Sequence, residues 1–167
     1  PAELERLQKA LTATRREIAR IQDQVRDRMG SSDAEIFDAH LLVLEDQTLL
    51  DEVKKFIESK NVNVEFAFHE VSENYAIALG SVEDEYLRER AADIRDVTSR
   101  VLGNLTGRGA LDLSHLTEPY ILVRHDLSPA DTAQINPEHV LGFATDVGGK
   151  TSHTAIIAGS LRIPAVV

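Results

Sequence analysis

The chain is 167 residues long, contains no cysteine and carries a formal net charge of −10 at pH 7. A disulfide framework and a thiolate metal site are therefore excluded, and the negative charge disfavours nucleic acid as a partner. No apolar run approaches membrane-spanning length, and no charged-then-apolar signal segment opens the chain, so we predict a cytoplasmic protein.

The negative charge is concentrated in the middle of the chain. The formal charges of residues 1–30 sum to +2, those of residues 31–108 to −9 and those of residues 109–167 to −3. An acidic surface of this kind attracts a basic partner at long range. A set of solvated helix faces explains the same run of charge equally well, so charge alone does not identify a binding surface.

The first 107 residues have the periodicity of long amphipathic helices. In the first helix, the positions of one face recur at alternating spacings of three and four until Met29 and Gly30 end it. A second helix is predicted after residues 31–33, an interruption at residues 45–48, and a third helix from Leu49 to Ile57. The positions of the seam along the first helix are Leu4, Leu7, Leu11, Thr14, Ile18, Ile21 and Val25.

The helical pattern resumes at Val64 and continues to Leu105, which is too long for one comfortable helix. Gly80 and Ser81 mark a kink or a break, because glycine costs about 1 kcal/mol in a helix interior. We therefore predict an antiparallel helical bundle over residues 1–108, made of long helices joined by short loops. Three glycines between residues 103 and 109 mark the boundary to a second domain, residues 109–167.

The second domain alternates strand and helix signals. Residues 120–123 and 140–147 are short apolar runs typical of buried strands, and residues 163–167 predict a further strand. Residues 128–131 give a helix start, with a serine N-cap, a proline at the first helical position and a carboxylate three residues after the cap. This order predicts a partial α/β domain. Because it is too short to close its own sheet, we expect a fragment of a larger protein.

One stretch of this domain places a histidine where a strand ends and a helix begins. Gly148 and Gly149 allow positive φ or a close approach to a ligand, and they leave amide groups that can point at an anion. Thr151 and Ser152 supply hydroxyls and an N-cap. His153 then falls in the first helical turn, where free N–H groups and the helix dipole favour negative charge. These residues predict a phosphate cradle.

Histidine suits covalent phosphate transfer. Its neutral ring nitrogen is nucleophilic near pH 7, and the phosphoramidate that results remains reactive. A lone histidine more often caps a helix or packs at a sheet edge, but the flanking glycines and hydroxyls favour the chemical role of His153.

Other interpretations remain open. A hydrolase would use Ser152 with His153 or Asp146, although adjacent residues rarely present a nucleophile and its base correctly, and no Gly-x-Ser-x-Gly elbow exists. A metal site at His153 lacks a second ligand at helical spacing; we expect His125 and His139 at the surface and predict no metal. A protein-binding adaptor built on the helices, with an inert α/β remnant, is the alternative outside enzymes.

The string from Gly148 to Ile156 closely resembles the phosphohistidine signature of the phosphoenolpyruvate-utilising enzymes, and its core matches at every position. Members include Enzyme I of the sugar phosphotransferase system, pyruvate phosphate dikinase and phosphoenolpyruvate synthase. Residues 34–46 and 86–96 also resemble the helical insertion of Enzyme I, which the other two lack at this place. The resemblance covers nearly the whole chain, and it implies a swivelling-type α/β domain after the helices.

The resemblance to Enzyme I implies a reaction and a partner. His153 would take a phosphoryl group from phosphoenolpyruvate through Nε2 and pass it to a histidine of the carrier protein HPr, with Thr132 hydrogen-bonded to His153. The helical bundle would dock HPr. The expected docking residues are His40, Val43, Asp46, Leu87 and Arg90.

The same resemblance places the phosphoenolpyruvate-binding barrel, with its Mg²⁺ site and dimer interface, in a C-terminal domain outside these residues. We therefore expect no cofactor in this fragment, Mg²⁺ and a homodimer in the full-length enzyme, and a monomeric fragment. One departure concerns Gly159, which stands where the family usually has arginine. A nitrogen-system Enzyme I and a multi-domain phosphotransferase would share all these features.

Overall fold

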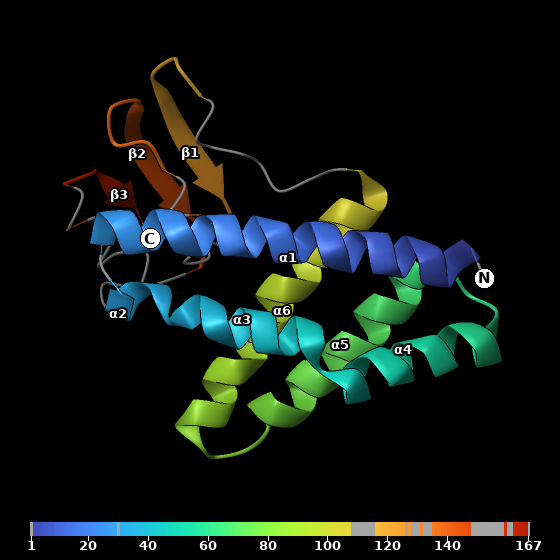
Figure 1. Cartoon of the computed structure of the whole chain (residues 1–167). Coiled ribbons are helices and arrows are strands. Elements are labelled where there is room, and N and C mark those ends of the chain that lie inside the picture. The colour runs from blue at the N-terminus through green and yellow to red at the C-terminus, as the bar shows by residue number, and fades with distance from the viewer. Residues whose placement is uncertain are drawn as a thin grey trace. The chain divides into compact units, whose positions relative to one another are not determined.

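The computed structural model describes residues 2–29, 31–107, 116–125, 127, 131, 135–147, 159 and 162–166. The chain divides into two compact units, Pro1–Ala110 and Leu111–Val167. The first unit contains the helices α1 to α6 and the second contains a three-stranded sheet (Figure 1). The predicted combination of a helical part and an α/β part is confirmed, while the antiparallel order of the bundle and the swivelling type of the second domain stay predictions.

The first helix, α1 (Ala2–Met29), follows the predicted heptad seam. The side chains of Thr14, Ile18 and Ile21 are completely buried, and the helix ends at Met29 as expected. Burial of one continuous stripe over this length explains why α1 is stable as a long helix, because helix propensity alone is a weak source of stability. No helix in the described part of the chain is both long and apolar enough to cross a membrane.

Three helices follow in short succession: α2 (Ser31–Ala34), α3 (Ile36–Glu45) and α4 (Gln47–Lys60). The interruption predicted at residues 45–48 is confirmed but is shorter, since only Asp46 leaves the helical conformation between α3 and α4. Its carboxylate accepts hydrogen bonds from the backbone N–H groups of Thr48 at 2.8 Å and Leu49 at 3.1 Å. One extended residue with a capping side chain is enough to start a new helix.

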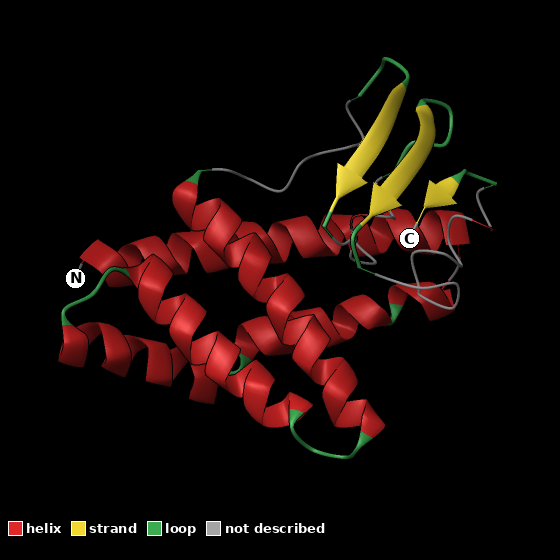
Figure 2. Ribbon diagram, turned by 180° about the vertical axis from the view of Figure 1, so that it is seen from behind, coloured by secondary structure: helices red, strands yellow, loops and turns green. Residues whose placement is uncertain are grey.

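The last two helices are α5 (Val64–Gly80) and α6 (Glu85–Thr106), joined by a short loop (Figure 2). The break predicted at Gly80 and Ser81 is confirmed. Asp84 caps α6 by accepting a hydrogen bond from the backbone N–H of Leu87 at 3.2 Å. At the other end, Gly107 adopts the left-handed conformation with φ 67°, which a helix C-terminus commonly requires and glycine adopts without steric cost.

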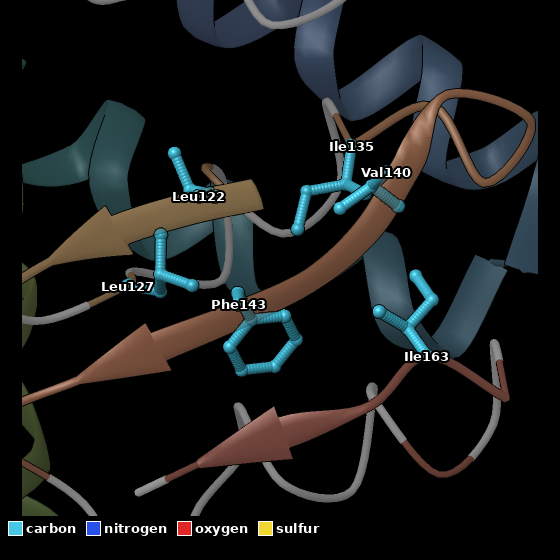
Figure 3. Close-up of a cluster of buried hydrophobic side chains, with 6 residues drawn as sticks. All are labelled: Leu122, Leu127, Ile135, Val140, Phe143 and Ile163. Carbon is cyan, nitrogen blue, oxygen red and sulfur yellow. The ribbon is translucent and has the colours of Figure 1, made fainter. Parts of the chain in front are cut away.

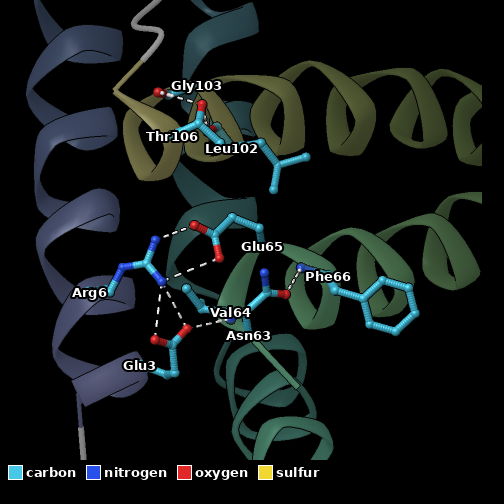
Figure 4. Close-up of polar contacts among 9 residues, drawn as sticks. All are labelled: Glu3, Arg6, Asn63, Val64, Glu65, Phe66, Leu102, Gly103 and Thr106. Atoms are coloured by element: carbon cyan, nitrogen blue, oxygen red, sulfur yellow. Dashed lines mark hydrogen bonds and ion pairs between the residues drawn. The ribbon is translucent and has the colours of Figure 1, made fainter.

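The first turn of α1 is joined to the first turn of α5 (Figure 4). Glu3 Oε2 accepts a hydrogen bond from the backbone N–H of Val64 at 2.7 Å, across 61 positions of sequence. Arg6 Nη1 lies 3.0 Å from Glu3 Oε2, and the same guanidinium pairs with Glu65. The Val64 hydrogen bond, and then the hydrogen bond from Arg6, lower the pKa of the Glu3 carboxyl below its usual value.

The second unit is built on three parallel strands: β1 (Tyr120–Arg124), β2 (Val140–Thr145) and β3 (Ala165–Val166), in that order across the sheet. Leu122 pairs with Phe143, which pairs with Ala165. The strands β2 and β3 lie within their predicted ranges, and β1 extends one residue beyond its range, to Arg124. Parallel neighbours need a crossover connection, which agrees with the predicted alternation of strand and helix, although of residues 128–131 only Asp131 is described.

Six buried side chains form the core of the sheet unit (Figure 3). The middle strand approaches the segment before β3 closely, because a Cβ at Gly142 would lie only 3.0 Å from the carbonyl oxygen of Pro164. That same carbonyl accepts a hydrogen bond from the Phe143 N–H at 3.0 Å. Gly142 therefore lets the two segments pair. The core residues are Leu122, Leu127, Ile135, Val140, Phe143 and Ile163.

Candidate functional site

The residues expected to carry or support the chemistry fall outside the described part of the chain. The described residues include the strand β2, which precedes the glycine pair Gly148 and Gly149, and residues 146 and 147, which lead into that pair. The undescribed residues are His153, Thr132, Gly148, Gly149, Thr151 and Ser152.

The segment that leads into the motif is fixed to the end of β1. The backbone N–H groups of Asp146 and Val147 both donate to the carbonyl oxygen of His125, each at 3.1 Å. The His125 ring adds a contact, with Nδ1 at 3.1 Å from Asp146 Oδ2. Because β1 and β2 are parallel, their carboxyl ends lie at one edge of the sheet, and open α/β sheets bind ligands outside this edge.

Two histidines of the sheet unit bear on the alternatives. His125 is 77% exposed, as predicted, whereas His139 is half-buried. The contact between Asp146 and His125 engages one of the two groups that a hydrolase could use beside Ser152, while the other, His153, lies outside the described residues. Within the described residues, no group of three or more histidine, aspartate or glutamate side chains is placed to hold a metal ion.

On the helical unit, three of the five expected docking residues lie around one hollow. Val43 and Asp46, at the end of α3, and Arg90, on α6, line a cavity of about 670 Å³, which we call the docking groove. The helix α5 completes it with Tyr75 and Leu79, among others. The groove therefore joins three separate stretches of the sequence, residues 39–46, 74–79 and 90–94.

The centre of the docking groove is apolar and its edges are charged. Leu79 and Val43 pack against a buried cluster that includes Ala91, while Leu42 is 66% exposed at the groove. Asp46 contributes a negative charge and Arg90 a positive charge. An apolar centre with a polar rim is the usual composition of a protein-binding surface.

The tyrosine of the groove is held by its hydroxyl, which donates a hydrogen bond to Glu52 Oε2 at 2.9 Å. This bond, reinforced by burial and by the nearby carboxylates, raises the pKa of Tyr75 above its usual value. The hydroxyl therefore stays protonated at neutral pH. The bond to Glu52 holds the uncharged tyrosine side chain in the lining of the groove.

The prediction that His40 contacts a partner is wrong. Its side chain is only 1% exposed and lies between α3 and α6, with Nε2 at 3.3 Å from Asp93 Oδ1 and Nδ1 at 3.6 Å from Asp96 Oδ2. The Phe37 ring packs against it edge-on, with centroids 5.5 Å apart. Two carboxylates and an aromatic ring hold the imidazole inside the unit. Leu87 is half-buried on α6, and its role in docking stays a prediction.

Sequence reasoning missed Leu42 and Tyr75. A signal for Leu42 was present, because residues 41–44 are four consecutive apolar residues and one helix face cannot bury them all. Tyr75 lies on the regular apolar pattern of α5, where a groove residue and a core residue look alike in the sequence.

Comparison with known families gives a match over most of the chain. The family model described as "PEP-utilising enzyme, N-terminal" matches residues 1–90, and that described as "PEP-utilising enzyme, mobile domain" matches residues 116–167. The chain belongs to the PEP-utilising enzymes, in their Enzyme I branch. The resemblance seen in the motif and in the helices is thereby confirmed.

Individual relatives place the chain within that branch. The phosphoenolpyruvate-protein phosphotransferase of Bacillus subtilis (strain 168) is 48% identical over 166 residues, which are 99% of this chain and 29% of that protein. The solution NMR structure of the Enzyme I (nEIt) protein is 46% identical with a TM-score of 0.84, and the N-terminal domain of Enzyme 1 - Nitrogen is 30% identical with a TM-score of 0.70. In both comparisons the match covers 99% of this chain and 67% of the other.

The chain spans only 29% of the length of its curated relatives, which carry the name of an enzyme. It corresponds to an N-terminal part of a phosphoenolpyruvate-protein phosphotransferase.

Proposed function

We propose that this chain is the phosphoryl-transfer part of an Enzyme I that acts in the cytoplasm in sugar uptake. His153 receives a phosphoryl group that originates from phosphoenolpyruvate and passes it to a histidine of HPr. The observation that carries the proposal is the complete phosphohistidine signature, residues 148–156, directly after a strand whose end is fixed at the ligand-binding edge of a parallel sheet. The identity of 48% to a phosphoenolpyruvate-protein phosphotransferase supports it.

In the proposed step, Nε2 of neutral His153 attacks the phosphorus atom. A P–N bond forms at Nε2 while the bond from phosphorus to the donor breaks, whether the donor atom is the enol oxygen of phosphoenolpyruvate or a ring nitrogen of phosphorylated HPr. Phosphoryl transfer depends mainly on position and charge. Thr132 would hold the ring, and the amides of Gly148 and Gly149 would hold the phosphate oxygens.

The hydroxyls of Thr151 and Ser152 would complete that cradle. Phosphoenolpyruvate and Mg²⁺ would be bound by the C-terminal domain of the full-length, dimeric enzyme, where the metal would neutralise phosphate charge. No residue described in this chain is assigned to the metal.

The docking groove is the proposed site for HPr. A cradle for one phosphate offers too little area for a protein complex, since specific interfaces usually bury about 1,000 Å² or more. Leu42 and Leu79 offer the apolar centre, while Asp46 and Arg90 select a basic and an acidic group on the carrier. The charge of −9 over residues 31–108 would steer HPr to this unit, most strongly at low salt.

The nitrogen-branch alternative has less support. Identity to the N-terminal domain of Enzyme 1 - Nitrogen is 30%, against 46% to the Enzyme I (nEIt) structure. Competition between HPr and a nitrogen-branch carrier for this chain would separate the two branches.

Phosphate labelling tests the chemistry. Incubation of the chain with phosphorylated HPr should give an acid-labile, base-stable adduct that disappears in His153→Ala. The matched control is His69→Ala, since His69 is exposed on α5, and it should keep the label. Retained labelling in His153→Ala would refute the assignment.

Binding of unphosphorylated HPr tests the groove. Leu42→Asp should weaken HPr binding about tenfold or more, because it places a charge in the apolar centre of the interface. Phe66→Asp is the control, as Phe66 is also an exposed apolar residue of a helix but does not line the groove. Equal affinity of both variants, measured by calorimetry, would remove the groove from the proposal.

A further inference from the structure

A row of ionisable side chains crosses the interior of the helical unit and ends at the docking groove. It starts on α1, passes through α6, includes one side chain of α3 and returns to α6. In order, its members are Glu17, Arg100, Asp96, His40, Asp93 and Arg90.

Each member contacts the next. Arg100 Nη1 lies 2.6 Å from Glu17 Oε1, and Arg100 Nε lies 3.3 Å from Asp96 Oδ2. His40 bridges Asp96 and Asp93, as described above, and Asp93 Oδ2 lies 3.3 Å from Arg90 Nη1. The side chains of Arg100 and His40 are 4% and 1% exposed, whereas Arg90, which lines the groove, is 30% exposed.

The His40 ring contacts the two carboxylates of α6 unequally. Nε2 lies 3.3 Å from Asp93 Oδ1, close enough for the ring to donate a hydrogen bond to that carboxylate. Nδ1 lies 3.6 Å from Asp96 Oδ2 and has no hydrogen-bond partner among the described residues. The contact with Asp93 is therefore the one through which His40 can act on the groove.

Two other carboxylates of α3 are engaged elsewhere. Asp38 Oδ1 accepts a hydrogen bond from Gln22 of α1 at 2.7 Å, and Glu45 pairs with Arg15 of α1. Among the described residues, the carboxylates that contact the His40 ring are those of Asp93 and Asp96, both on α6, and these pair in turn with Arg90 and Arg100.

We propose that His40 is a positioning residue for the docking groove: it fixes Asp93, and Asp93 fixes the guanidinium of Arg90 at the groove wall. This inference rests on the proposed docking function. Oδ1 of Asp93 contacts His40 and Oδ2 contacts Arg90, so the carboxylate cannot rotate without losing a partner.

Such positioning matters for affinity. Arginine has a long side chain that loses much rotational freedom when a partner orders it. A guanidinium already held at the groove wall avoids part of this loss. Without His40, Arg90 and Asp93 would still pair, but they would move together, and HPr would have to order both.

The first test needs no partner. In the chain of residues 1–167, His40→Gln should shift or broaden the NMR signal of Arg90 Nε–H. Arg95 is the internal reference, because it lies on the same helix and pairs with Glu73 at 2.8 Å, and its signal should not change. An unchanged Arg90 signal in folded His40→Gln would overturn the proposal.

The second test measures HPr binding by calorimetry. His40→Gln should weaken HPr binding about five- to tenfold, while the control His69→Gln should not. In an Arg90→Ala background, His40→Gln should cause no further loss, because its effect passes through Arg90. The same loss in both backgrounds would indicate a general structural role and would overturn the positioning role.

Two further points keep the tests decisive. If His40→Gln does not fold, Asp93→Asn replaces it, since this variant keeps the shape of the side chain and should free Arg90 in the same way. If the unmodified chain does not bind HPr, the proposed docking function fails. If that chain binds HPr and folded His40→Gln binds equally well, only the positioning role fails.

Discussion

At the scale of single residues, Gly159 is the position at which the resemblance to Enzyme I implies an arginine. It is exposed, and a Cβ built on it would meet no atom of the described residues within 4 Å. A larger side chain at this position therefore displaces none of the described residues.

We expect Gly159→Arg to speed phosphoryl transfer from HPr to His153 by about tenfold, because a guanidinium near the phosphate would stabilise its charge. Stopped-flow mixing with phosphorylated HPr measures the rate. Gly159→Ala is the control that adds a side chain without charge, and it should transfer at the original rate. Equal rates for the arginine and alanine variants would show that the missing guanidinium is not limiting.

The histidines show what the sequence could and could not predict about the site. His40 follows Phe37 by three positions and precedes Leu44 by four, so its spacing already places it on the buried face of α3. The resemblance to a docking helix led to the opposite expectation. The two carboxylates that stabilise a buried imidazole lie on α6, and no local pattern connects them with His40.

At the scale of elements, the break between α3 and α4 combines a structural and a binding role in one residue. The Asp46 carboxylate caps α4 and also lines the docking groove. Substitutions can separate these roles, because asparagine keeps an acceptor for the cap and loses the charge.

Asp46→Ala should lower the free energy of unfolding by about 1 kcal/mol through loss of the cap. Asp46→Asn should leave stability nearly unchanged and weaken HPr binding at low salt. Urea unfolding and calorimetry measure the two effects. If each variant weakens HPr binding only in proportion to its own loss of stability, the charge of Asp46 has no separate role.

The contact between α1 and α5 predicts a dependence on pH. The pKa of Glu3 is lowered in the folded state, so its carboxylate stabilises the fold above the unfolded pKa, and this contribution is lost as pH falls through the folded pKa. Glu3→Gln should therefore lower Tm at neutral pH and have the same Tm as the unmodified chain in acid.

Thermal unfolding followed by circular dichroism measures this. Glu5→Gln is the control, because the pKa of Glu5 is also lowered, but by its exposed neighbour Lys9 on the same helix. It should have a smaller effect at neutral pH. A difference between Glu3→Gln and the unmodified chain that persists in acid would exclude the carboxylate as its cause.

Most helices and strands of this fold could be predicted from the sequence. The spacing of three and four along α1, the glycine at the end of α5 and the short apolar runs of the sheet are local signals of strong physical constraints. The docking groove could not be predicted in the same way, since it depends on how α5 packs beside α3 and α6. Tyr75 and Leu79 face the groove only because of that packing.

At the scale of the whole molecule, the chain consists of two compact units with separate proposed tasks. The family models also match it in two parts, residues 1–90 and 116–167. The buried core of the first unit and the row of ionisable side chains from Glu17 to Arg90 lie entirely within residues 1–110.

We expect residues 1–110 to fold alone and to bind HPr with an affinity close to that of the whole chain. The affinity should fall as salt rises, because the acidic surface steers the carrier. Calorimetry at low and high salt tests this, with circular dichroism to confirm folding. A folded fragment that does not bind HPr would reduce the helical unit to a spacer for the phosphohistidine segment.

The hydrogen bond from Val64 to Glu3 also has a consequence for the order of folding. The helices α5 and α6 are neighbours in sequence, whereas α1 meets α5 only after a loop of 61 positions closes, which is entropically slower. The pair α5 and α6 should therefore form early, and α1 should dock late, after the main barrier. Glu3→Gln should then accelerate unfolding while the folding rate stays nearly constant, so the first turn of α1 would limit how long the folded unit persists.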